Sequence, residues 1–113
     1  MYKTQADARA YFVELVPLVS VSTHCEIIVA TPFTALAASV EATRGTAISI
    51  AAQDVCWEAE GAFTGEVSAA MLTDVGCRAV LIAHSEMRQF CGETDERVAG
   101  IHFFVLRSAW CWA

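Results

Sequence analysis

Residues 78–86 read Arg-Ala-Val-Leu-Ile-Ala-His-Ser-Glu, in which an apolar run ends in a polar cluster. A short continuous apolar run is typical of a strand buried on both faces, as in a parallel sheet. His84, Ser85 and Glu86 follow at the carboxyl end of this predicted strand, where α/β proteins bind ligands. The stretch therefore predicts an α/β fold with a ligand site beside His84.

Two segments upstream have the same character. Glu26-Ile-Ile-Val-Ala30 is stopped by Pro32, and Ala47-Ile-Ser-Ile-Ala-Ala52 precedes a long connection, residues 53–67. A loop of this length inside a compact domain is usually functional. Three predicted strands that alternate with helical segments favour a parallel sheet with right-handed crossovers.

Helix signals fill the intervals between these strands. Thr4 with Asp7 resembles a capping box, and Pro17 predicts a kink or an end of the first helix. Thr34 and Ser68 are predicted N-caps of the next two helices. Two glycines should end those helices and a threonine should start a last one: Gly45, Gly76 and Thr94. The predicted order is α-β-α-β-α-β-α.

Composition excludes several classes of partner. The 113-residue chain is 56% apolar and carries a formal charge of −6. No apolar run approaches the ~18 residues of a membrane span, so we expect no membrane partner. The acidic balance argues against nucleic acid as a partner. The polar residues 1–9 lack the apolar core of a signal peptide, and a cytoplasmic location follows as the default.

Five cysteines are spaced irregularly, without a CxxC pair: Cys25, Cys56, Cys77, Cys91 and Cys111. This pattern predicts reduced thiols in a cytosolic protein. A zinc site that combines them with histidines is the alternative, and nothing in the spacing supports it. We therefore expect neither a metal nor a cofactor.

Three features are candidates for function, and each has a structural alternative. His84 can polarise a carbonyl or shuttle a proton near neutral pH, although a single histidine after a strand is more often structural. The acidic segment 92–96 complements a helix dipole, which is the simpler explanation for it. Phe63, between Gly61 and Gly65, marks either an ordinary turn or a protruding contact loop.

Five segments, in this order and spacing, resemble triosephosphate isomerase: Thr31-Pro-Phe33, Gln53-Asp-Val55, Gly61-Ala-Phe-Thr-Gly-Glu66, His84-Ser-Glu86 and Cys91-Gly-Glu-Thr-Asp-Glu96. The resemblance covers residues 1–99, whereas the apolar tail 100–113 does not resemble the family. The family fold is a (β/α)₈ barrel of roughly 250 residues. The resemblance implies a partial TIM barrel, half-barrel-like and without the first strand, with about three parallel strands and flanking helices.

The resemblance also implies roles for individual residues. His84 matches the electrophile that, in the family, polarises the substrate carbonyl as a neutral imidazole, and Glu86 matches an acid that supports it. The family interconverts glyceraldehyde 3-phosphate and dihydroxyacetone phosphate in glycolysis and gluconeogenesis. A small sugar phosphate is therefore the ligand class that the resemblance implies.

Residues 53–66 match the family's dimer loop, whose tip at Thr64 reaches into the neighbouring subunit in the family. Met87 replaces a family arginine that pairs with acids around this loop. We expect this change to loosen a family-like dimer and to leave an acid unpaired. The predicted interface residues are Gln53, Phe63, Thr64, Glu66 and Met87.

Several departures from the family bear on activity. The family's catalytic asparagine and lysine lie just upstream of Met1, and Lys3 does not take the lysine's place. The catalytic glutamate, the closing loop and the glycine-rich phosphate site lie downstream of the matching region. Ala83 replaces a family glycine, and its methyl group crowds the substrate side of His84. We expect little or no isomerase activity from this truncated form.

A partial barrel would leave two sheet edges unpaired, at residues 26–30 and 78–83, and would expose its inner face. We expect oligomerisation to complete it, as a homodimer or a homotetramer. The apolar tail should cover the inner face or add to an edge, with these large side chains buried: Phe103, Phe104, Leu106, Trp110 and Trp112.

Three functional hypotheses follow. The first is an inactive, self-associating relic of the isomerase. The second is a weak isomerase whose active site is assembled between chains, because proton transfer needs a base within hydrogen-bond reach. The third is a non-catalytic assembly module whose self-association depends on the aromatic tail.

Overall fold

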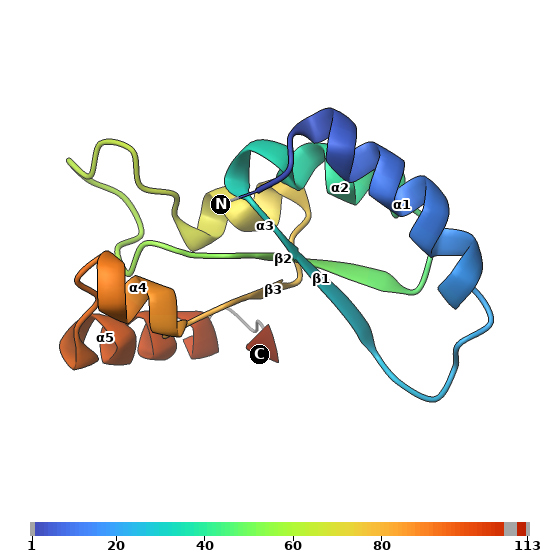
Figure 1. Ribbon diagram of the computed structural model, residues 1–113. Helices are drawn as coiled ribbons and strands as arrows, with labels where there is room; N and C mark the ends of the chain where they lie inside the picture. Colours follow the sequence, from blue (N-terminus) through green and yellow to red (C-terminus); the bar gives the residue numbers. More distant parts are fainter. Residues whose placement is uncertain (1, 108–110, 113) are drawn as a thin grey trace.

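The computed structural model describes residues 2–107 and 111–112, with side chains described as far as His102. The sheet is parallel throughout, in the order β1-β2-β3-β4 (Figure 1). The strands are β1 Ile27–Thr31, β2 Ile48–Ala52, β3 Ala79–Val80 and β4 Cys111–Trp112. The helices are α1 Gln5–Val19, α2 Leu36–Ala42, α3 Ala69–Val75, α4 Ser85–Phe90 and α5 Asp95–Arg107, with a 3₁₀ turn at Phe33–Ala35. The predicted α/β class, with a short parallel sheet and flanking helices, is confirmed.

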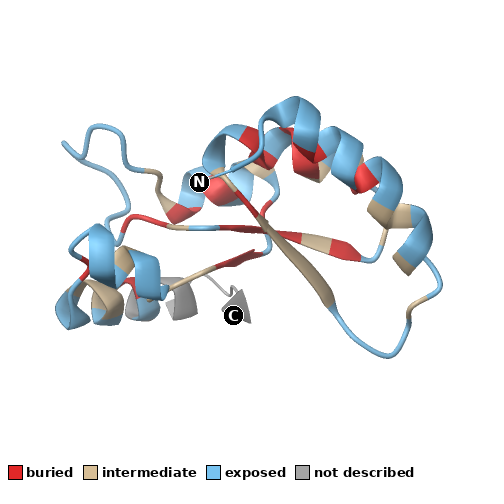
Figure 2. Ribbon diagram, viewed as in Figure 1, coloured by how far each residue is buried: buried red, intermediate tan, exposed pale blue. Residues whose placement is uncertain are grey.

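The core lies between one face of the sheet and helices α1 to α3, which pack in a row over it (Figures 1 and 2). Its largest fully buried apolar side chains are Phe12 from α1, Leu72 from α3 and Val80 from β3. β2 adds Ile48 and Ile50 to the same cluster. Ile101 of α5 joins that cluster, so α5 is tied to the core although it lies beyond the end of the sheet.

Most predicted helix ends are confirmed by their capping bonds. Thr4 and Asp7 form a reciprocal capping box at the start of α1. The Ser68 hydroxyl accepts from the Met71 N–H at the start of α3, and Gly76 ends that helix in the left-handed conformation at φ 102°. The Arg97 N–H donates to the Thr94 hydroxyl at the start of α5.

Two details of the helix prediction are wrong. Thr34 does not cap α2, because it lies inside the 3₁₀ turn and α2 begins after Ala35 without a side-chain cap. Gly45 has a positive φ of 77° but lies beyond the helix, which ends at Ala42. The predicted end of the first helix near Pro17 agrees with the structure to within two residues, since α1 ends at Val19.

The third strand is shorter than its apolar run. β3 covers Ala79 and Val80, although the Leu81 N–H still donates to the Ala52 carbonyl at 2.9 Å. The chain then turns at Ala83, whose φ is 60°, and enters α4 at Ser85. A left-handed residue cannot continue a strand, so the extended chain after β3 goes no further than Ala83, and His84 lies at the start of α4.

The edge at residues 78–83 is not free, because β4, which comes from the apolar tail, pairs with β3 in parallel; the expected addition of the tail to a sheet edge is confirmed. At the other edge, β1 has only β2 as a neighbour among the described strands. Helix α5 continues across the predicted boundary between residues 99 and 100. The division into 1–99 and 100–113 stays a prediction, and the tail side chains named for burial (Phe103, Phe104, Leu106, Trp110, Trp112) lie outside the described ones.

No helix in the described part of the chain has the length and hydropathy needed to cross a membrane.

We predict that Ala83→Gly stabilises the fold. An L-residue in the left-handed region costs roughly 1–2 kcal/mol, and glycine removes this cost. Glycine also raises the chain entropy of the unfolded state, which lowers stability by about 0.4–1 kcal/mol. The net gain should be roughly 0.5–1 kcal/mol in urea unfolding. Ala70→Gly, at an exposed helical position of α3, is the matched control and should cost about 1 kcal/mol. Equal losses in both variants would contradict the proposed strain.

Candidate functional site

A cavity of about 580 Å³ opens where the carboxyl ends of β1 to β3 meet α4. In parallel α/β proteins this end of the sheet is where ligands bind. Four of the predicted site residues line it: Gln53, His84, Glu86 and Met87. The other wall residues are Pro32, Phe33, Asp54, Leu81, Phe90 and Cys91. The structure thus brings together the residues that follow three different strands.

His84 is the N-cap of α4, and its side chain is about half exposed to solvent. Its Nδ1 accepts a hydrogen bond from the Glu86 N–H at 3.3 Å, and Glu86 Oε2 lies 3.9 Å from the same nitrogen. Because Nδ1 is the acceptor, the neutral ring carries its proton on Nε2. His84 can therefore donate from Nε2 to an oxygen in the cavity, which is the chemistry needed to polarise a carbonyl.

Gln53 and Asp54 follow β2 and form hydrogen bonds at its carboxyl end. Gln53 Nε2 donates to the Ala30 carbonyl of β1 at 3.2 Å, so this predicted interface residue is part of the strand junction. Asp54 Oδ1 accepts from the Val55 N–H at 2.8 Å. Burial raises the pKa of Asp54; the bond from Val55 opposes this, and the charge of Glu66 adds to it.

The acid left unpaired beside Met87 is Glu93. We expected an unpaired acid at or near Glu66, but Glu66 Oε1 lies 3.8 Å from Arg97 and is therefore paired. Glu93 is only 8% exposed, and its Oε2 has no hydrogen-bond partner among the described residues. Its N–H donates to the Met87 carbonyl at 3.2 Å, which places its backbone beside Met87.

Sequence reasoning missed Glu93 because it assigned the whole acidic segment 92–96 to a helix dipole. Asp95 and Glu96 do lie in the first turn of α5, whereas Glu93 precedes Thr94 and is buried. Desolvation raises the pKa of Glu93, the charge of Asp54 raises it further, and Arg88 and Arg97 oppose the shift. Met87 in place of a basic residue was the signal that pointed to it.

The loop 53–67 is held at its base and exposed at its tip (Figure 1). The Cys56 N–H donates to the Val67 carbonyl at 2.8 Å and closes the base. Trp57 packs on α5 so closely that a Cβ at Gly100 would lie 2.6 Å from its Cε3. Thr64 is exposed and Phe63 is 43% exposed, so these two predicted interface residues are available for contact outside the chain.

No group of three metal-ligating side chains comes together within the described part of the chain. The cysteines described there are free thiols: Cys25, Cys56, Cys77 and Cys91. Burial raises the pKa of Cys77 to about 11, which leaves this thiol unreactive near neutral pH.

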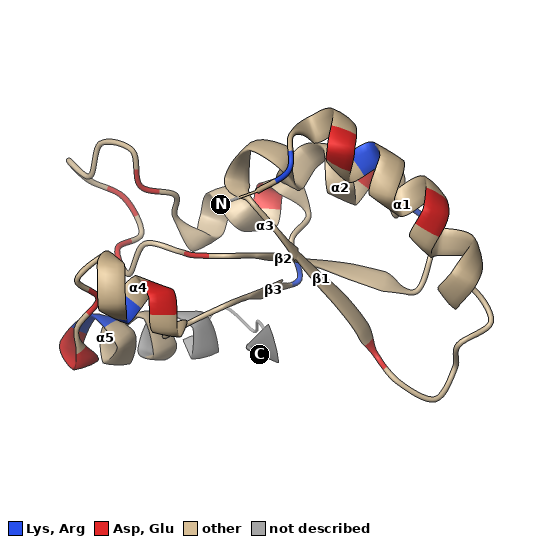
Figure 3. Cartoon of the chain, in the orientation of Figure 1, with Lys and Arg blue, Asp and Glu red and all other residues tan. Residues whose placement is uncertain are grey.

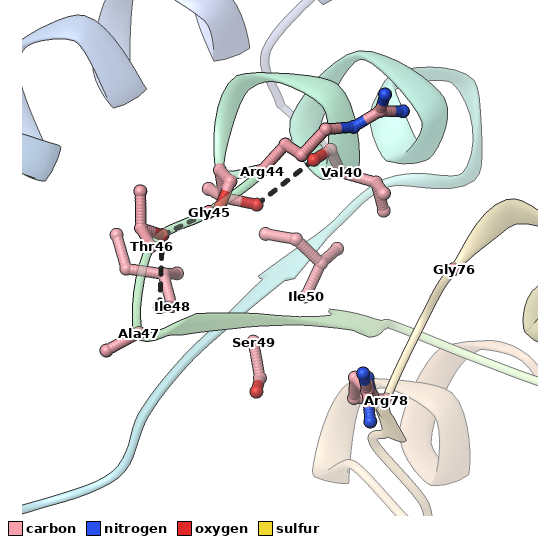
Figure 4. Close-up of a pocket in the computed structure, with 11 residues that line it drawn as sticks. Val40, Arg44, Gly45, Thr46, Ala47, Ile48, Ser49, Ile50, Gly76 and Arg78 are labelled. Carbon is pink, nitrogen blue, oxygen red and sulfur yellow. Dashed lines mark hydrogen bonds between the residues drawn. The ribbon is translucent and has the colours of Figure 1, made fainter.

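A second cavity, of about 260 Å³, lies at the opposite, amino end of β2 (Figure 4). Arg44 and Arg78 both line it, but Arg44 already contacts Glu41 at 2.7 Å. The Thr43 hydroxyl donates to the Ser39 carbonyl of α2, and the Thr46 hydroxyl donates to the Thr43 carbonyl in the turn between α2 and β2. These polar groups stabilise the turn, and no predicted site residue lies there.

We predict that Glu93 makes the fold less stable as pH rises. A carboxyl whose pKa is raised by folding contributes stability below its unfolded pKa of about 4.3, and that stability is lost as pH rises through the folded pKa. Glu93→Gln should therefore gain stability over the parent between about pH 4.5 and pH 7 in urea unfolding. Glu96→Gln, at an exposed position of α5, is the control. A difference between parent and Glu93→Gln that does not change with pH would contradict this assignment.

Comparison with known proteins agrees with this geometry. The sequence profile of the triosephosphate isomerase family matches residues 1–109. The triosephosphate isomerase of Solibacter usitatus is 56% identical over 98 residues, which are 87% of this chain and 39% of the relative. That of Geotalea uraniireducens is 49% identical over 108 residues, 96% of this chain and 43% of the relative.

The triosephosphate isomerase of Moorella thermoacetica is 52% identical over 98 residues. The chain spans about two fifths of the length of these relatives, 39% to 43%. The predicted family and the partial-barrel architecture are therefore confirmed. This chain belongs to the triosephosphate isomerase family.

Proposed function

We propose that these 113 residues are a self-associating part of a triosephosphate isomerase that does not turn over substrate by itself. The observation that carries the proposal is the charge of the cavity around His84. Asp54 and Glu86 line it, and no lysine or arginine is among its described lining residues. A sugar phosphate is an anion, and a cavity with two acids and no cation binds it poorly.

The position of the acids also argues against proton transfer. An isomerase of this class needs a base within hydrogen-bond reach of the substrate carbon's proton. Glu86 lies on the Nδ1 side of His84, whereas the nitrogen free to polarise a carbonyl is Nε2. His84 can therefore supply an electrophile, but Glu86 is placed to orient the ring rather than to act on a substrate.

Self-association is supported by two exposed features. The tip of the loop 53–67 presents Phe63 and Thr64, and in the family this loop reaches into the neighbouring subunit. The second feature is β1, whose outer edge has no neighbour among the described strands. Unpaired strand edges and exposed apolar side chains both favour association between copies. We propose a homodimer or homotetramer, and a cytoplasmic location in keeping with free thiols.

The chain should show no isomerase turnover above buffer with glyceraldehyde 3-phosphate, measured by coupled reduction of dihydroxyacetone phosphate. His84→Gln should give the same rate, because no step depends on the ring. If the parent turned over substrate and His84→Gln did not, the second hypothesis would replace this one: a weak isomerase assembled between chains. Addition of inorganic phosphate should leave the melting temperature unchanged, because the cavity has no cation for it.

The mass in solution should be that of two or four chains by light scattering coupled to size exclusion. Phe63→Asp should shift the population toward monomer, because it places a charge in the proposed contact. Leu18→Asp is the matched control on α1, where Leu18 is 76% exposed and lies outside the loop. A monomeric parent at all concentrations would refute self-association, and an equal effect of both substitutions would refute the role of the loop.

A further inference from the structure

A further cavity, of about 250 Å³, lies at the carboxyl end of β1, between this strand and the start of α1. The segment before α1 contributes Tyr2 and Lys3 to its wall, and α1 contributes Tyr11. Gln53 lines both this cavity, here called the β1 cavity, and the one beside His84. The two cavities are therefore neighbours, but most of their wall residues differ.

The β1 cavity is opposite in charge to the cavity beside His84. Lys3 is the one charged residue among its described lining residues, and no acid is among them. Acidic residues predominate along the loop 53–67, whereas a basic residue lies in the segment before α1 (Figure 3). An anion in the β1 cavity would therefore meet a positive charge that the cavity beside His84 lacks.

The Lys3 ammonium is available to a ligand. It forms no ion pair with the described carboxylates and lies 5.1 Å from the centroid of the Tyr2 ring, in a cation–π contact. Asp7, the acid next along the chain, belongs to the helix cap, where its Oδ2 accepts from the N–H and the hydroxyl of Thr4. Those two bonds from Thr4 lower the pKa of Asp7, and the charge of Lys3 contributes least to this shift. Lys3 is thus a cation without an anionic partner among the described residues.

The walls of the β1 cavity suit an aromatic ring. Tyr11 is 46% exposed, and its ring makes an edge-on contact with Phe12, with the centroids 5.4 Å apart. A ring held in this way can stack on a ligand at little cost in conformational entropy. Val29 adds apolar surface, whereas the Thr31 hydroxyl is closed to solvent and takes no part in binding. The volume is below the roughly 300–1,000 Å³ of sites for drug-sized ligands, so a single ring with one small substituent fits.

We propose that the β1 cavity binds a small aromatic carboxylate, with the carboxylate on Lys3 Nζ and the ring against Tyr11. A carboxylate is the better match than a phosphate, because one ammonium balances one negative charge, and at the helix start the Thr4 hydroxyl already accepts from the Asp7 N–H. An aromatic body is the better match than an aliphatic one, because a tyrosine face and a ligand ring can stack. The proposal concerns a cavity other than the one beside His84, and it does not depend on isomerase activity.

The test is calorimetric titration of the whole chain with benzoate at millimolar concentration, beside benzamide as its neutral isostere. Benzoate should bind about fivefold more tightly than benzamide, which is the effect expected of an ion pair that is open to solvent. Salt at about 0.5 M should remove most of this difference, because it screens exposed charges. Equal binding of the two compounds at low salt, or no binding of benzoate, would overturn the proposal.

Variants of two basic residues locate the charge. Lys3→Gln should lower the affinity for benzoate to that for benzamide and leave benzamide binding unchanged, whereas Lys3→Arg should retain the preference for benzoate. Arg9→Gln is the matched control, because Arg9 is an exposed cation of α1 that does not line the β1 cavity. Circular dichroism checks that each variant is folded. Equal losses of benzoate affinity in Lys3→Gln and Arg9→Gln would indicate attraction to overall charge alone and refute the site.

The contribution of the ring is measured separately. Tyr11→Leu should weaken benzoate and benzamide alike by about fivefold, because both lose the stacking face. Val13→Ala is the control on α1, since Val13 is 75% exposed and does not line the β1 cavity. Acetate and inorganic phosphate should bind the parent chain more weakly than benzoate. Unchanged benzoate affinity in Tyr11→Leu, or acetate binding as tight as that of benzoate, would refute an aromatic ligand.

Discussion

The parallel pairing of β2 with β1 on one side and β3 on the other is the constraint on which the rest of the structure depends. β2 matches all five residues of β1, from Ile27 against Ile48 to Thr31 against Ala52. β3 joins the other side through Ala79 and Val80. Because the strands are parallel, their carboxyl ends meet at one edge of the sheet, and the residues that follow them share one cavity.

The same pairing explains why the chemistry is concentrated after the strands. Gln53 and Asp54 follow β2, and His84 follows the turn that comes after β3. The turn requires a left-handed residue at Ala83, whose φ is 60°. A methyl group at that position costs conformational energy that a glycine would not, and His84 is placed at the helix start in spite of this cost. His84 thus lies at the wall of a cavity that has acids where a phosphate would need cations.

The unusual electrostatics are concentrated around Met87 and Glu93. Met87 contributes apolar surface to the cavity wall, and beside it Glu93 is buried with an unpaired oxygen. The cost of an uncompensated buried charge is reduced when the carboxyl takes up a proton, which is why the pKa of Glu93 is raised. Glu66 does not share this state, because Arg97 of α5 reaches it across the base of the loop. Coupling between loop and α5 therefore involves both an ion pair and the contact of Trp57 with Gly100.

The sequence by itself determined the features that depend on neighbours along the chain. The capping box of Thr4 with Asp7, the cap at Ser68, the left-handed Gly76 and the apolar strands all follow from local hydrogen bonding and periodicity. The position of His84 after a strand, and the family motifs around it, were readable for the same reason. Only the tertiary structure decided that α2 starts after Ala35, that β4 covers the edge of β3, and that Glu93 is buried while Glu66 is paired. These outcomes depend on which segments distant in sequence come into contact, and burial and ion pairing are properties of those contacts rather than of any residue type.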